Sequence, residues 1–114
     1  PNFDDLLTIL NNTDLKKPVI ITEFGGGARA GNRGTAETMW TEEFQEAIYK
    51  KQYAALDKAV YVQGITPWIL YDFRAVRRMN RYQEGFNRKG LIDSDRTTKK
   101  LAYYVTKEYY KTKG

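Results

Sequence analysis

The sequence predicts an α/β fold with parallel strands, and two observations carry this prediction. Residues 18–25 read Pro-Val-Ile-Ile-Thr-Glu-Phe-Gly, a nearly unbroken apolar run that ends in a carboxylate and a glycine-rich loop. A strand that is apolar on both faces is typical of a parallel sheet covered by helices. Helical and strand-like patterns also alternate along the chain, in the order helix, strand, helix, strand, helix, which predicts right-handed crossovers between parallel strands.

The first helix is predicted over residues 2–12. Asn2 suits the N-cap, and two aspartates in the first turn interact favourably with the helix dipole. Its apolar residues recur at helical spacing: Phe3, Leu6, Leu7 and Leu10. A polar break at residues 11–14 separates this helix from the apolar strand, and the loop after the strand, residues 25–34, is too rich in glycine for regular structure.

A second helix is predicted to begin at Thr41, or near Thr38, and to run to about residue 58. Glu42 and Glu43 follow Thr41 and suit the first turn. The expected buried stripe of this helix consists of Phe44, Ile48, Ala55 and Ala59.

The second strand is predicted over residues 61–73, which are rich in β-branched and aromatic side chains. Pro67 has no backbone N–H to donate, so we expect a bulge or irregularity near Trp68. Residues 74–89 read as a long polar loop. The last helix is expected to bury one side, formed by Leu101, Tyr104, Val105 and Tyr109.

Composition limits both the fold and the chemistry. The chain has 114 residues and a net charge of +5, whereas a complete parallel α/β barrel needs roughly 250 residues. Because it begins at Pro1 and enters directly into a helical pattern, we expect a piece of a larger protein. The absence of cysteine and histidine excludes disulfides, the usual zinc sites and histidine-dependent triads. No apolar run predicts a membrane span, and catalysis must rest on carboxylates, tyrosines or lysines.

Glu23 is the candidate catalytic residue, because reactive groups in parallel α/β folds sit at the carboxyl ends of strands. The alternative is that Glu23 caps a helix or accepts a hydrogen bond from a loop amide. Two other patterns are set aside. The glycines at 25–27 lack the spacing of a phosphate-binding loop, so no nucleotide cofactor is expected. The tyrosines and lysines of residues 103–111 fit helical spacing better than a nucleic-acid surface.

Four motifs resemble those of a known protein family and occur in the same order and at similar spacing as in that family. They are residues 21–25 (Ile-Thr-Glu-Phe-Gly), residues 39–45 (Met-Trp-Thr-Glu-Glu-Phe-Gln), Trp68 with Asp-Phe at 72–73, and residues 87–90 (Asn-Arg-Lys-Gly). The chain resembles the last quarter of the catalytic barrel of family 2 glycoside hydrolases, which include β-glucuronidases, β-galactosidases and β-mannosidases. The resemblance implies that residues 1–114 form the C-terminal segment of a (β/α)8 TIM barrel, with no cofactor or metal.

The resemblance also implies roles for individual residues. Glu23 matches the nucleophile of a retaining mechanism, and Trp68 matches the aromatic floor of the sugar site, although it also suits a barrel core. Asn87 and Lys89 match a clamp for the carboxylate of a uronic acid, although other members of the family share a similar string and the segment also reads as a surface loop. These residues favour a retaining exo-β-glycosidase of the β-glucuronidase type, with β-galactosidase as an alternative.

A retaining glycosidase needs two carboxyl groups about 5 to 5.5 Å apart. In this family the acid/base is a glutamate that follows an asparagine, and the chain contains no Asn-Glu dipeptide. Glu84 and Asp72 could replace it but match no motif. We therefore expect the isolated chain to be inactive and to associate, through its open sheet edges, with the rest of its parent or with itself. A non-catalytic module that binds anionic carbohydrate or self-assembles is the alternative from another class.

Overall fold

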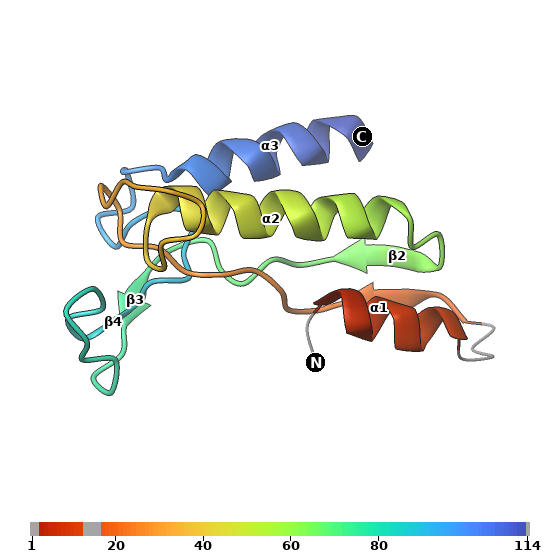
Figure 1. Cartoon of the computed structure of the whole chain (residues 1–114), viewed down its shortest axis with the longest axis horizontal. Coiled ribbons are helices and arrows are strands. Elements are labelled where there is room, and N and C mark those ends of the chain that lie inside the picture. The colour runs from red at the N-terminus through yellow and green to blue at the C-terminus, as the bar shows by residue number, and fades with distance from the viewer. Residues whose placement is uncertain (1–2, 13–16, 114) are drawn as a thin grey trace.

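The computed structural model describes residues 3–12 and 17–113 and shows a mixed α/β arrangement (Figure 1). The predicted alternation is confirmed, with one hairpin added before the last helix. The elements are α1 (Phe3–Asn12), β1 (Val19–Ile21), α2 (Glu42–Asp57), β2 (Val62–Ile65), β3 (Phe73–Arg74), β4 (Phe86–Asn87) and α3 (Leu101–Lys113). The N-cap predicted at Asn2 and part of the predicted break, at residues 13 and 14, lie outside the described residues.

Strands β1 and β2 pair in parallel, as predicted, with Ile21 opposite Ile65. The pairing continues past both named strands. Thr66 donates its backbone N–H to the carbonyl of Ile21 at 2.9 Å, and Trp68 donates to that of Phe24 at 2.8 Å. The segments that follow β1 and β2 therefore stay side by side. The first carries Glu23 and the second carries Trp68.

The core lies between the β1–β2 sheet and the helices, with α2 and α3 running alongside each other (Figure 1). Its buried members are Ile21, Phe24, Tyr49, Tyr53, Leu56, Leu91 and Ala102. Tyr53 joins the two helices, because its ring stacks on Tyr109 with centroids 4.0 Å apart and its hydroxyl lies 2.8 Å from that of Thr106. Ile20 points the other way and is 64% exposed, so one face of the sheet has no cover within the described residues.

The predicted start of α2 is confirmed, since Thr41 is the N-cap and its hydroxyl accepts the N–H of Phe44 at 3.0 Å. The predicted stripe is wrong in part. Phe44, Ile48 and Ala55 are only half-buried, while Ala59 is buried just beyond the helix. The most buried side chains of α2 are Glu42, Gln45, Tyr49, Tyr53 and Leu56. The Gln45 amide nitrogen donates to the carbonyls of Gly26 and Gly90, and Glu42 accepts the N–H of Leu101, so these polar groups have partners where they are buried.

The predicted buried side of α3 needs a similar correction. Tyr104 is 53% exposed, whereas Ala102 and Thr106 are the buried residues of the helix. The small side chains of Ala102 and Thr106 let α3 approach α2 closely, and the larger tyrosines on neighbouring positions lie at the edges of that contact.

The single strand predicted over residues 61–73 is wrong. The regular strand β2 ends at Ile65, just before Pro67, and the peptide between Trp68 and Ile69 is cis, so the predicted irregularity near Trp68 is confirmed. The predicted polar loop over residues 74–89 is partly regular as well, because β3 and β4 form an antiparallel hairpin. Among the described residues, no helix is long and apolar enough to cross a bilayer.

The carboxylate of Asp95 stabilises the loop before α3, and this stabilisation depends on pH. Its carboxylate accepts the backbone N–H groups of Thr97 at 2.9 Å and Thr98 at 2.8 Å, and also the hydroxyl of Thr98. The Thr98 hydroxyl, followed by the backbone donors, lowers the pKa of Asp95 from 3.8 to about 2. Because the folded pKa lies below the unfolded one, this stabilisation is present above pH 3.8 and is lost as the pH falls through about 2.

We therefore expect Asp95→Ala to lower the apparent melting temperature at pH 7, with a smaller difference from the parent protein at pH 2. Thermal melts followed by circular dichroism at both pH values measure this. Ser94→Ala, one residue away in the same exposed loop, is the control and should change neither melt. An Asp95→Ala difference of the same size at pH 7 and pH 2 would contradict the role of the ionised carboxylate.

Candidate active site

Glu23 lies two residues beyond β1, with an exposed side chain on a backbone that is fixed on both sides. Before it, the carbonyl of Thr22 accepts the hydroxyl of Thr66 at 2.6 Å. After it, the carbonyl of Phe24 accepts the N–H of Trp68, and the ring of Phe24 is buried in the core. The sequence produces this arrangement because an apolar strand and a buried aromatic residue flank one glutamate. The backbone that carries the carboxylate is thus fixed, while the side chain itself is exposed.

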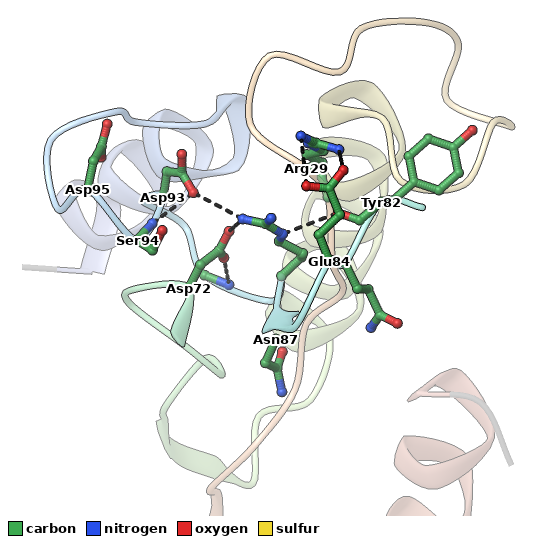
Figure 2. Close-up of polar contacts among 12 residues, drawn as sticks. Arg29, Asp72, Tyr82, Glu84, Asn87, Asp93, Ser94 and Asp95 are labelled. Atoms are coloured by element: carbon green, nitrogen blue, oxygen red, sulfur yellow. Dashed lines mark hydrogen bonds and ion pairs between the residues drawn. The ribbon is translucent and has the colours of Figure 1, made fainter. Parts of the chain in front are cut away.

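Asn87 and Lys89 lie at the end of β4 and form a local pair. The Oδ1 atom of Asn87 accepts both the backbone N–H of Lys89, at 3.1 Å, and the ammonium of Lys89, at 3.3 Å. The Asn87 side chain points away from the neighbouring ion pairs (Figure 2). Burial, and then repulsion from Arg78, lower the pKa of Lys89, while the attraction of Glu23 partly opposes both. The ammonium of Lys89 is thus held beside the amide of Asn87.

Trp68 and the residue after it connect these two parts of the site through backbone hydrogen bonds. Its own N–H bonds to the segment of Glu23, and the next residue, Ile69, donates to the carbonyl of Lys89 at 3.1 Å. Its half-buried ring packs edge-on against Phe73, with centroids 6.1 Å apart. The structure thus brings the segments of all four predicted site residues together at the carboxyl ends of β1 and β2.

The two carboxylates considered as replacements for the acid are both engaged elsewhere (Figure 2). Asp72 is 3% exposed and lies 2.8 Å from the ammonium of Lys100. Burial raises its pKa, and the charge of Lys100 offsets part of that rise. Glu84 is exposed, but it forms a 2.7 Å ion pair with Arg29. Asp72 is therefore a structural carboxylate beneath the loops, and Glu84 belongs to a surface ion pair.

Three polar residues that support the site were missed by sequence reasoning. Lys100 is completely buried, and its ammonium contacts the carbonyls of Ala28 and Arg88. The side-chain amide of Gln45, also fully buried, donates to the carbonyls of Gly26 at 2.9 Å and Gly90 at 3.0 Å. Glu42 accepts the first N–H of α3, from Leu101, at 2.9 Å. Each reads in the sequence as a solvated helix residue, and no local pattern distinguishes Lys100 from the exposed Lys99.

The glycine-rich loop after Glu23 is packed against the protein. A Cβ atom at Gly27 would lie 3.2 Å from the carbonyl oxygen of Arg88, and one at Gly26 would lie 2.7 Å from Ile48. These glycines let the loop approach the helix and the Asn87–Lys89 segment closely. Within residues 3–12 and 17–113, no group of acidic side chains is placed to hold a metal ion.

The chain is similar to β-glucuronidases and to a β-galacturonidase. It is 34% identical over 86 residues to the β-glucuronidase of Paenibacillus borealis, which covers 75% of this chain and 14% of that protein. Its structure matches a GH2 β-galacturonidase from Eisenbergiella tayi bound to galacturonate with a TM-score of 0.82 and 32% identity, over 97% of this chain and 20% of that one. It also matches the β-glucuronidase of Ruminococcus gnavus in complex with D-glucuronic acid, with a TM-score of 0.82 and 29% identity, over 95% and 18% of the two chains.

No family model matches the sequence. The agreement with these enzymes in sequence and in structure defines the class as a segment of a glycoside hydrolase. The chain belongs to the family 2 glycoside hydrolases. It spans 14 to 16% of the length of the curated relatives that it matches.

Proposed function

We propose that the protein carrying this chain is a retaining exo-β-glycosidase that removes terminal β-linked uronic acids, with β-glucuronides favoured. The observation that carries the proposal is that the Glu23 and Asn87–Lys89 segments are joined through residues 68 and 69, whose backbone N–H groups donate to the carbonyls of Phe24 at 2.8 Å and Lys89 at 3.1 Å. A lysine next to an amide suits the carboxylate of a uronic acid. The β-glucuronidase relatives and the structural match to a β-galacturonidase with bound galacturonate support the same substrate class.

The proposed chemistry begins with Glu23. Its carboxylate attacks the anomeric carbon, the bond to the aglycone oxygen breaks, and a covalent glycosyl ester forms. A second carboxyl group, about 5 to 5.5 Å from the first, protonates the departing oxygen and then activates the water that hydrolyses the ester. Trp68 provides an apolar surface for the C–H face of the sugar. Asn87 and Lys89 bind its carboxylate.

The second carboxyl group is proposed to come from outside this chain. Of the two candidates within it, Asp72 is buried against Lys100 and Glu84 pairs with Arg29. An isolated chain with Glu23 but no acid/base would have no group to protonate the leaving oxygen. We therefore propose that the chain alone does not hydrolyse glycosides.

We also infer that the chain is the C-terminal segment of a (β/α)8 barrel and that the rest of the barrel covers its open faces. Within the described parts of the chain, β1 and β2 pair only with each other, so the outer edge of each strand is open to a further strand. On the sheet face away from the helices, Ile20 is exposed. Beside α3, a groove presents an apolar surface, formed mainly by Pro67, Ile69, Leu70, Leu91, Tyr103 and Tyr110. Self-association of the chain through these surfaces is the alternative.

Removal of the Lys89 side chain tests the uronide specificity. A charge-assisted hydrogen bond contributes about 1.5 to 3 kcal/mol, so Lys89→Ala should lower kcat/KM for an aryl β-glucuronide by roughly 10- to 100-fold. The matching aryl β-glucoside, which has a hydroxymethyl group in place of the carboxylate, should change by less than about threefold. Both are measured with the longest protein that contains this chain.

Lys99→Ala is the control for this experiment, because Lys99 is exposed and its ammonium lies over the ring of Tyr103, 5.2 Å from the centroid. It should leave both substrates unchanged. An equal loss on the glucuronide and the glucoside in Lys89→Ala would show that Lys89 does not recognise the carboxylate.

A further inference from the structure

The side chain of Lys100 is completely buried, and its ammonium group contacts the loop that follows Glu23 and the segment that carries the clamp. Its Nζ atom lies 2.6 Å from the carbonyl oxygen of Ala28, 3.2 Å from that of Arg88 and 2.8 Å from Oδ1 of Asp72. An ammonium has three protons to donate. All three are thus used, and they join three chain segments that are far apart in the sequence.

Asp72 completes the cross-link from the other side. The same Oδ1 atom accepts the backbone N–H of Gly90 at 2.8 Å, and its Oδ2 atom faces the guanidinium of Arg88 at 3.7 Å (Figure 2). Both side chains of the Asp72–Lys100 pair are 0% exposed. Burial raises the pKa of Asp72 and lowers that of Lys100, and each charge offsets this effect in the other.

The pair acts on the segment that carries the clamp. Arg88 lies between Asn87 and Lys89, and its carbonyl accepts hydrogen bonds from both the Lys100 ammonium and the backbone N–H of Ala28, the latter at 3.0 Å. Gly90, which follows Lys89, is held by Asp72. The buried pair therefore holds the backbone on both sides of Lys89. The backbone of Glu23 is fixed separately, by its hydrogen bonds to the continuation of β2.

We propose that Lys100 and Asp72 are positioning residues for uronide recognition: the buried pair sets the placement of Asn87 and Lys89 relative to Glu23. A buried ion pair stabilises a fold little compared with apolar residues of similar size, because both charges lose their hydration. Its specific contribution here is geometric, since it joins the clamp to the loop that follows Glu23. This inference rests on the proposed uronide hydrolysis.

The test is the double variant Asp72→Asn/Lys100→Met, which removes both charges without leaving one of them buried alone. We expect the ratio of kcat/KM for an aryl β-glucuronide to that for the matched β-glucoside to fall by about tenfold or more, as for loss of a charge-assisted contact. Both substrates are measured on one preparation of the longest protein that contains the chain. Unfolded material lowers both rates equally, so the ratio reports on the clamp alone.

Lys99→Met is the matched control, since it removes a neighbouring lysine that is exposed, and its ratio should equal that of the parent. An unchanged ratio in the double variant would overturn the positioning role. So would failure of the double variant to fold under any condition tested, because the pair would then maintain the fold rather than selectivity. If the parent itself does not prefer the glucuronide, the proposed function fails, and that result is distinct from either outcome.

Discussion

Glu23→Gln is expected to eliminate glycoside hydrolysis by the protein that contains this chain, with kcat/KM reduced by roughly 10⁴-fold or more, as for loss of other catalytic nucleophiles. The amide has nearly the shape of the carboxylate but cannot form the glycosyl ester. Because Glu23 is exposed and its backbone is fixed by the continuation of β2, the substitution should leave the fold intact. Steady-state kinetics on an aryl β-glucuronide, with circular dichroism to verify folding, measure the effect.

Glu37→Gln is the matched control for this result. Glu37 is also an exposed glutamate, and it lies in a turn of the loop that follows β1. Its substitution should leave kcat/KM within about twofold of the parent, as expected for a surface change outside the site. A Glu23→Gln protein that kept more than about a tenth of the parental activity would be incompatible with a nucleophile at this position, which should cost orders of magnitude.

Gly90→Ala should produce the largest loss of stability. A methyl group at this position would overlap the backbone nitrogen of Asp72 and would lie 2.5 Å from the carbonyl carbon of Tyr71. Backbone atoms cannot rotate aside as a side chain can, so the backbone at Gly90 and the backbone at residues 71–72 must move apart. The hydrogen bond from the N–H of Gly90 to the carboxylate of Asp72 must then lengthen. We expect the free energy of unfolding to fall by about 3 kcal/mol or more, at the upper end of overpacking effects. Urea unfolding measures it.

Gly31→Ala separates this clash from a purely conformational effect. Gly31 has a positive φ of 81°, but nothing lies within 4 Å of a Cβ atom placed there. The cost should be about 1 to 2 kcal/mol, from the left-handed backbone alone. If Gly90→Ala cost no more than Gly31→Ala, the close approach of Gly90 to Asp72 would not be a requirement of the fold.

The parallel pairing and the placement of Glu23 could be predicted because they depend on local signals. An apolar run beginning at Pro18 and ending at Glu23 identified β1, and the hydroxyl of Thr41 identified the start of α2. The irregularity near Trp68 also followed from the sequence, since Pro67 has no N–H to donate, although β2 ends at Ile65 and not at the predicted residue 73. These features need only a few neighbouring residues to specify them.

The supports of the site could not be predicted, because they depend on partners far away in the sequence. Lys100 contacts the carbonyl of Ala28, 72 residues earlier, and nothing local separates it from the exposed Lys99. The α2 stripe was misjudged for the same reason: the buried amide nitrogen of Gln45 donates to carbonyls 19 and 45 residues away in the sequence. The β3–β4 hairpin is too short, at two residues a strand, to produce a recognisable alternation.

Trapping of the glycosyl ester is the most direct test of the central claim, that Glu23 is the nucleophile of a retaining uronidase. A 2-deoxy-2-fluoro-β-glucuronosyl fluoride slows hydrolysis of the ester more than its formation, so a covalent intermediate accumulates. After incubation with the longest protein that contains this chain, peptide mass spectrometry should place one fluoro-uronosyl group on Glu23, and none in the Glu23→Gln protein. Labelling of a different carboxylate, or turnover of β-glucuronides by an enzyme that never acquires the label, would contradict the assignment.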